Sequence, residues 1–253
     1  MKYFYTLVML CCLGSLAGRG QTSLFSRHWY VGSDVGIFSN STRMIAGELG
    51  KYTAGNSGIM PIYGLRVGRV LAPYASVETG VYSLPLNLVY LYQTDKAIGG
   101  KQFNFLTIPL RFNWRTRVFH EQFEAHLSGG VHYVWTGGEM IEKPFGGLIT
   151  TPAHARKDSL TYSGGVSVTR RHAANAEVGI SFNWAMSKRW TMSVYGRQMI
   201  GLMNVAKMNV SIRNNQLPVE TAEFVSNTSG FNAGLSIRFN FFPKINRQIA
   251  ISR

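Results

Sequence analysis

Apolar side chains alternate with polar ones or glycine in segment after segment of this chain, and this repetition leaves few folds open to it. The pattern is clearest at residues 174–185, where Val178 and Ile180 share one face and Glu177 lies on the other. A period of two places neighbouring side chains on opposite faces of a β-strand. Segments of about ten residues with one apolar face are typical of strands that cross a membrane. A soluble β-sandwich also alternates, but it rarely carries large apolar side chains along one face of strand after strand.

Eight segments follow the pattern, at residues 29–38, 60–71, 75–84, 103–115, 122–135, 174–185, 190–203 and 230–242. Their connections alternate between long stretches, such as 136–173, and short turns, such as 72–74. Barrels of bacterial outer membranes alternate in this way, because their turns are short on one side of the membrane and their loops are long on the other. We therefore predict an all-β fold, a transmembrane antiparallel up-and-down β-barrel of eight strands within residues 21–242. A further hairpin near 160–169 would make ten strands and is the alternative.

Residues 1–20 have the features of a secretory signal peptide, with a positive residue, Lys2, before a short apolar core and a run of small residues. Both cysteines, Cys11 and Cys12, lie in this segment, so the exported chain has no thiol for a disulfide, a metal site or a nucleophile. Beyond it, no apolar run is long enough for a membrane helix. We therefore predict that the exported chain is a barrel in the cell outer membrane. Because the number of strands is even, both termini lie on the same side, which we predict to be the periplasm. Residues 243–253 are predicted to form a basic periplasmic tail.

The charged and aromatic residues indicate lipid as a partner. Charged residues make up 15% of the chain, below the ~25% of a typical soluble domain, yet the net charge is +14. The excess is predicted to lie on both rims of the barrel and accompanies no nucleic-acid motif. We therefore expect contacts with outer-membrane lipid and lipopolysaccharide, and with the barrel-assembly machinery, but none with nucleic acid. Aromatic residues at the predicted strand ends fit interfacial girdles, with Trp29, Trp114, Trp184 and Trp190 at the periplasmic ends and Tyr133 and Trp135 at the outer ends.

The polar faces of the strands predict the content of the barrel. The charged residues at inward positions are four acids and four arginines, namely Asp34, Arg66, Glu78, Arg111, Glu124, Glu177, Arg197 and Arg238. An unpaired charge in so narrow a space is unfavourable, so we expect these residues to form a charge network by pairing. An eight-stranded barrel is just wide enough for its side chains to fill it. A packed, salt-bridged interior is therefore favoured over a polar channel or proton path.

Few residues suggest catalysis. His126 and Ser128 share a strand face, and their spacing resembles that of lipid A deacylases, which are also small outer-membrane barrels. That resemblance would make Ser128 the nucleophile and His126 the base, with Glu139 or Glu142 as the orienting acid. Both side chains are predicted to face the lumen, away from lipid, so a hydrogen-bonded interior pair is the favoured interpretation. His126 and His132 lack a carboxylate at a convincing spacing, so we expect no metal site, and we expect no cofactor.

Two basic clusters fall in the longest predicted loop. They are Arg170-Arg171-His172 and Arg156-Lys157. Either could bind sugar phosphates, and either could equally be a solvated rim.

Three stretches resemble a known family. Leu106–Phe112 reads Leu-Thr-Ile-Pro-Leu-Arg-Phe, and the runs at 64–68 and 76–80 are similar to a second hairpin. They resemble the outer-membrane β-barrel proteins common in Bacteroidota, the PorT-like group, over about residues 29–242. Members of that group usually end on an aromatic residue, whereas here Phe241-Phe242 is followed by 243–253. Recognition by the assembly machinery would then need an internal signal.

The resemblance implies a barrel architecture and says little about function, although the group includes a component of a secretion system. We expect a non-enzymatic outer-membrane barrel with a membrane-structural or surface-interaction role. The first alternative is a subunit of a protein-secretion or envelope complex. The others are a lipid A-modifying hydrolase and a narrow channel.

Overall fold

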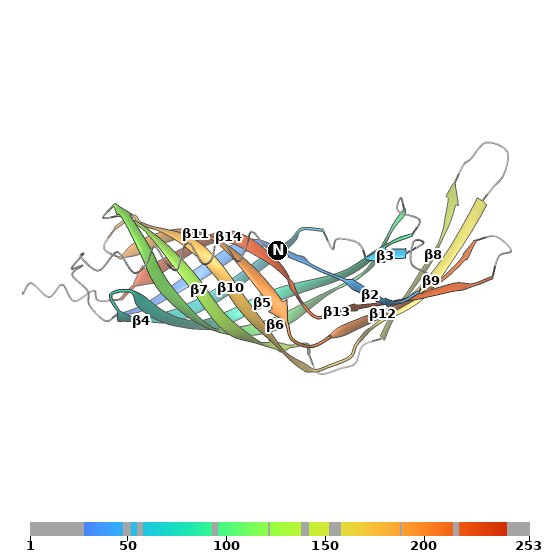
Figure 1. The fold of residues 1–253 in the computed structure, drawn as a ribbon, viewed down its shortest axis with the longest axis horizontal. Coiled ribbons are helices and arrows are strands. Elements are labelled where there is room, and N and C mark those ends of the chain that lie inside the picture. Colours follow the sequence, from blue (N-terminus) through green and yellow to red (C-terminus); the bar gives the residue numbers. More distant parts are fainter. Residues whose placement is uncertain are drawn as a thin grey trace, which may run out of the picture.

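The computed structural model describes residues 28–47, 52–54, 58–92, 96–120, 122–137, 142–151, 158–187, 189–214 and 218–241. These residues form fourteen β-strands in two sheets (Figure 1). None of the described segments is a helix of the length and apolarity that a membrane span requires. The predicted signal peptide and the predicted basic tail lie outside the described residues.

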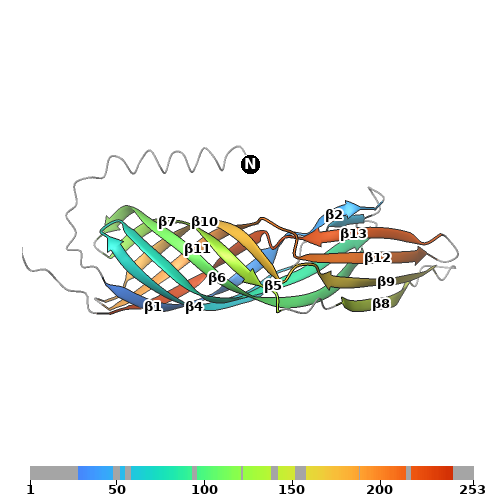
Figure 2. The same ribbon diagram turned by 90° about the horizontal axis from the view of Figure 1, so that it is seen from below.

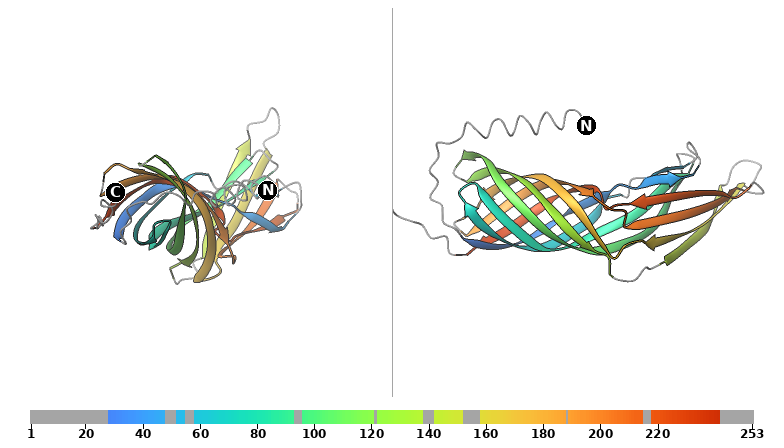
Figure 3. Two further views of the ribbon diagram at one scale, coloured as in Figure 1. Left: turned by 60° about the vertical axis from the view of Figure 1, so that its left-hand side comes forward. Right: turned by 60° about the horizontal axis from the view of Figure 1, so that its bottom comes forward.

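Eight strands close into a barrel, which confirms the predicted fold. They are β1 (Trp29–Asn40), β4 (Met60–Ala72), β5 (Ala75–Tyr92), β6 (Lys96–His120), β7 (Phe123–Trp135), β10 (His172–Ala185), β11 (Trp190–Gly201) and β14 (Gly230–Asn240). Each pairs antiparallel with its neighbours in the order β5-β4-β1-β14-β11-β10-β7-β6, and a β5–β6 pairing closes the ring. The strands wrap around a common interior (Figure 3). The short connections β4–β5, β6–β7 and β10–β11 share one end of the barrel with the start of β1, which we call the short-turn end.

The outer surface of the barrel is apolar all the way round. Each of the eight strands turns at least one large aliphatic side chain outward near its middle, which are Val35, Leu65, Val81, Leu110, Val131, Ile180, Val194 and Leu235. The cross-strand register sets many of them side by side, for example Val35 against Leu235 and Leu235 against Val194. An exposed apolar surface of this extent is unfavourable in water, but it suits a hydrocarbon environment.

Aromatic side chains gather at the short-turn end. Exposed Trp114 packs on Tyr74 with ring centroids 4.8 Å apart, and Trp190 meets Phe239 at 5.0 Å. Trp184 stacks on a neighbouring phenylalanine, and Trp29 lies under the guanidinium of Arg69. Amphipathic rings favour the interface between hydrocarbon and water, so this girdle marks one edge of the apolar belt.

The remaining six strands lie beyond the other end of the barrel, and five of them form the second sheet. They are β2 (Arg43–Ala46), β3 (Tyr52–Ala54), β8 (Glu142–Thr151), β9 (Asp158–Val168), β12 (Ala206–Asn214) and β13 (Glu220–Ser226). Five of them pair in the order β2-β13-β12-β9-β8, and β3 pairs with the far end of β5. Figures 1 and 2 show this sheet facing the continuation of β5 and β6. We call these six strands, with the far ends of β5 and β6, the extension.

The extension corrects two expectations from the sequence. The stretches interpreted as long loops contain paired strands. The alternative of a hairpin near 160–169 that makes ten barrel strands is wrong. Residues 142–151 and 158–168 pair as β8 and β9, and β9 pairs with β12 in the second sheet rather than widening the barrel. The physical reason is visible in β12, where Met208, Val210 and Ile212 alternate with polar residues and are fully buried. These apolar faces are shielded from water only when strands from different loops meet.

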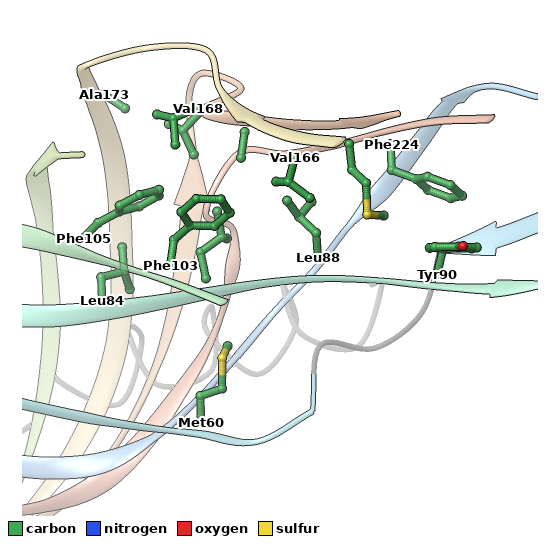
Figure 4. Packing of buried hydrophobic residues seen from close by; sticks show 14 of the residues in the cluster. Met60, Leu84, Leu88, Tyr90, Phe103, Phe105, Val166, Val168, Ala173 and Phe224 are labelled. Carbon is green, nitrogen blue, oxygen red and sulfur yellow. The ribbon is translucent and has the colours of Figure 1, made fainter. Parts of the chain in front are cut away.

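A single apolar cluster joins the extension to the barrel. Leu88 and Tyr90 of β5 are fully buried in it, and the Tyr90 ring stacks on Phe224 of β13 at 5.4 Å (Figure 4). The same cluster continues into the mouth of the barrel through Leu84 and Phe105. The extension and the extension end of the barrel therefore share one core.

Candidate functional site: the barrel interior

The interior of the barrel is layered from one end to the other. Because side chains alternate along a strand, Asp34 and Phe38 of β1 both point inward, and both are buried. Asp34 belongs to a charged layer, whereas Phe38 belongs to the apolar cluster nearer the extension. The neighbouring strand repeats this order with Arg66 and Ile62. A polar cavity lies on the other side of the charged layer, toward the short-turn end.

The charged layer is a closed ring of alternating acids and arginines. Its members, which we call the charge ring, are Asp34, Arg66, Glu78, Arg111, Glu177 and Arg197. Consecutive members lie 2.5 to 3.3 Å apart between nitrogen and oxygen, except for 4.0 Å between Arg197 and Glu177. All six side chains are at most 9% exposed. Three acids face three arginines, so the ring is electrically balanced.

The charge ring draws on every strand of the barrel. Six strands supply its members, β7 adds His132, and β14 adds Ser236. The His132 Nε2 atom lies 2.8 Å from a Glu177 oxygen, and Arg66 donates a hydrogen bond to the Ser236 hydroxyl. Burying so many ions is unfavourable unless each keeps several partners, and this arrangement supplies them. The ring therefore ties the eight strands together at one level.

Two tyrosines complete the hydrogen bonding of the acids. Tyr82 donates to Asp34 at 3.0 Å, and Tyr30 donates to Glu78 at 3.1 Å. Both rings need space that only glycine leaves. A Cβ atom on Gly64 would collide with the Tyr82 ring, and one on Gly68 would collide with the Tyr30 ring.

A second ionic group lies nearer the short-turn end. Glu124 accepts a hydrogen bond from Arg115 at 3.0 Å and lies 2.9 Å from the Nε2 atom of His126. The sequence places Glu124 among the inward charges, and the structure separates it from the charge ring. Arg115 is not among the inward charges predicted from the sequence, although its position two residues beyond another inward residue, Asn113, indicates the same face of the strand.

Arg238 contradicts the expectation that the interior charges pair. Among the described residues no carboxylate forms an ion pair with it, and its Nε atom is sealed from solvent without a hydrogen-bond partner. Its guanidinium lies 5.2 Å from the centre of the Tyr30 ring. Glu124, the acid of the second ionic group, is held by Arg115 and His126 instead.

The polar cavity contains both weak catalytic candidates. His126 and Ser128 line it, so both face the lumen rather than the lipid side. The expected hydrogen bond between them is not formed, because the Nε2 atom of His126 bonds to Glu124 and no described residue bonds to the Ser128 hydroxyl. Glu142 belongs to β8 in the extension, and Glu139 lies outside the described residues. Within the described part of the chain, no three His, Cys, Asp or Glu residues are arranged to hold a metal ion.

One of the two predicted basic clusters can be placed. Arg170, Arg171 and His172 lie exposed at the extension end of β10. The His172 Nδ1 atom lies 2.6 Å from the Tyr133 hydroxyl, and the two rings stack at 5.7 Å. Trp135 is paired with His172 across the strands. The second cluster, at residues 156–157, lies outside the described residues.

Comparison with known proteins identifies the architecture. No protein-family model matches the sequence, and no curated protein matches it. Among solved structures, the outer membrane protein OprG from Pseudomonas aeruginosa superposes with a TM-score of 0.52 at 10% identity, covering 86% of this chain and 97% of that one. The N-terminal barrel domain of OprF from the same organism superposes with a lower TM-score of 0.41 at 11% identity, covering 85% of this chain and 98% of that one.

The likeness to OprG concerns the fold and assigns neither a family nor a bacterial group. The predicted membership of the PorT-like group stays a prediction. What the fold and the interior establish together is a closed eight-stranded barrel of the outer-membrane type with a salt-bridged interior.

Proposed function

We propose that this protein is a non-enzymatic barrel of the cell outer membrane that presents a folded β-sheet extension at the cell surface for contact with a partner or surface ligand. The observation that carries this proposal is the apolar cluster shared by the barrel mouth and the extension. A shared core holds the extension in a fixed relation to the membrane. Surface loops without such a core would move independently of the barrel.

The surface of the barrel supports the membrane location and lipid as a partner. Its apolar belt and aromatic girdle match the hydrocarbon and one interface of a bilayer. Arg170 and Arg171 at the extension end would lie at the other interface, beside Tyr133 and Trp135. Basic residues beside aromatic ones suit the phosphates of lipopolysaccharide. Like any barrel of this type, the protein would need the assembly machinery to insert.

The layered interior supports a plug rather than a channel. An ion that entered from the short-turn end would meet the charge ring, whose side chains already pair with one another. Beyond the ring it would meet Phe38, Leu84 and Phe105, which are at most 3% exposed. Moving a bare ion through packed apolar side chains is strongly unfavourable.

The size and lining of the polar cavity argue against a hydrolase. The cavity has a volume of about 20 Å³, which is enough for one or two waters and too small for an acyl ester. A serine nucleophile also needs its base within hydrogen-bonding distance, and His126 is engaged by Glu124. Lipid acyl chains would lie on the opposite side of the strand from Ser128.

A subunit of a protein-secretion or envelope complex is the second candidate function. It would use the same extension, and it differs only in the identity of the partner. Such a subunit would migrate as part of a larger assembly when solubilised membranes are separated under native conditions. A variant that unfolds the extension would then migrate as the free barrel.

Cysteine labelling in intact cells tests the proposed arrangement. Asn209 is exposed on β12 of the extension, and Gln122 is exposed in a short turn. A membrane-impermeant maleimide should label Asn209→Cys in intact cells and Gln122→Cys only after the outer membrane is permeabilised. Cys11 and Cys12 are absent from the exported chain if the predicted signal peptide is removed. Labelling of Gln122→Cys alone in intact cells would show the opposite orientation in the membrane. Recovery of a soluble protein would exclude the membrane location.

A further inference from the structure

The polar cavity between the charge ring and the short-turn end is lined by hydrogen-bond donors, and some of these donors have no acceptor among the described residues. Its lining includes Arg238 and four serines, Ser128, Ser181, Ser193 and Ser236. Ser193 donates to Asn183 at 2.5 Å, and Ser236 accepts from Arg66. No described residue forms a hydrogen bond with the hydroxyls of Ser128 and Ser181. These two hydroxyls are therefore available to a guest in the cavity.

The charges around this cavity do not balance. The charge ring is neutral by itself, because three acids face three arginines. Toward the short-turn end, the described interior contains one further acid, Glu124, and two further arginines, Arg115 and Arg238. Glu124 pairs with Arg115, so the described interior keeps one positive charge in excess, and it is located at Arg238. The Nε–H group of this arginine has no acceptor among the residues that the structure describes.

A partly buried cation whose Nε–H group is sealed from solvent without an acceptor is unfavourable, and water alone does not neutralise its charge. We propose that the cavity binds one small inorganic anion of halide size, held by the guanidinium of Arg238 and by the hydroxyls of Ser128 and Ser181. The chemistry is that of other anion sites, where charge-assisted donors and hydroxyls surround a negative charge. The ligand is monovalent because the excess charge in the described interior is one.

The dimensions of the cavity select the class of anion. The cavity has a volume of about 20 Å³, whereas a single water needs roughly 10–15 Å³. A halide is of this size, and an organic carboxylate is not. The charge ring and the apolar cluster close the side toward the extension. The site is therefore a blind pocket that binds an anion and does not conduct it.

Halide-dependent stability tests the proposal. The purified protein in detergent micelles would be heated in chloride and in gluconate, an anion too large for the pocket, at equal ionic strength. Chloride should raise the Tm in a saturable way, as a ligand that binds only the folded state does. Arg238→Gln should weaken the apparent chloride affinity roughly tenfold or more, because a hydrogen bond to a charged group is lost. Arg69→Gln, on the outside of the same barrel end, should respond to chloride like the wild type.

Crystals of the wild-type protein soaked in bromide provide an independent measurement. An anomalous peak within hydrogen-bonding distance of the Arg238 guanidinium is expected, and it does not depend on whether the variant folds. Water in the cavity with no anomalous signal would overturn the proposal. The same chloride response in the wild type and in Arg238→Gln would overturn it as well, since the stabilising anion would then bind elsewhere.

Discussion

Arg111 illustrates how a single inward residue holds this barrel together. It is among the largest fully buried side chains of the protein, and it bridges Glu78 and Glu177 at 2.8 and 2.5 Å. Breaking a buried ion pair on one side leaves a charge without a partner, which is far more damaging than removing the whole pair. Removing the Arg111 side chain would therefore leave two buried acids without this cation and lower the stability of the barrel.

Substituting Arg111 by methionine should lower the free energy of unfolding by about 3–5 kcal/mol, because two buried acids lose their partner. Urea unfolding of the protein in lipid vesicles, followed by tryptophan fluorescence, would measure the change. The matched control is Arg43→Met on β2, where the arginine is exposed, and its effect should stay within about 0.5 kcal/mol. Equal effects of the two substitutions would show that the charge ring adds nothing to stability.

Gly64 offers a steric test of the same interior. Alanine there would press on the Tyr82 ring and disturb its hydrogen bond to Asp34. Overpacking of this kind should destabilise the barrel by about 1–3 kcal/mol in the same unfolding assay. Gly129→Ala is the control, because the nearest atom to an added Cβ atom lies at 3.8 Å. A stable Gly64→Ala variant would mean that Tyr82 lies elsewhere.

The strands of the extension differ from those of the barrel in what covers them. Barrel strands turn apolar side chains outward, whereas Met208, Val210 and Ile212 of β12 point into the shared core. The edges of the second sheet carry features that discourage pairing with other chains. β2 is only four residues long, and β8 contains Pro144.

Charging the buried face of β12 should open the extension and leave the barrel in place. Val210→Lys places a cation in the shared core and should destabilise the second sheet by several kcal/mol, whereas the neighbouring substitution Asn209→Lys is exposed. Limited trypsin digestion of the reconstituted protein would then cut Val210→Lys within β12 far faster than Asn209→Lys. Similar digestion of both variants would show that β12 is not packed in a core.

At the scale of the whole molecule, packed side chains fill the interior between the middle of the barrel and the extension. The charge ring fills the middle of the barrel, and the apolar cluster occupies its mouth. Each layer alone would hinder conduction, and together they separate the polar cavity from the opposite side.

The purified protein should give no stable single-channel current in planar bilayers. The reason is that the path crosses packed apolar side chains, which an ion enters only at a large energetic cost. An eight-stranded porin-like conductor measured under the same conditions would serve as the positive control. Reproducible ion-selective steps that change in Arg111→Ala would show that the charge ring lines a channel.

Local periodicity accounts for what the sequence alone determined. The eight barrel strands, their inward and outward faces, and the aromatic girdle at the short-turn end all follow from period two and from contact with lipid. These properties can be read from the residues of each single strand. In β1, for example, Val35 and Asp34 lie on opposite faces, the first exposed and the second buried. The same reasoning predicted the inward charges except Arg115.

Only the tertiary structure decided which of these residues meet. Glu124 pairs with Arg115, which was not among the predicted inward charges, and Arg238 is left without an ion pair among the described residues. Pairing depends on distances across the barrel and on strand register. The extension was overlooked for a similar reason. The alternation in β12 is present in the sequence, but a short amphipathic segment forms a strand only when partners such as β9 and β13 cover it. Those partners come from separate loops, so their meeting is a property of the folded chain.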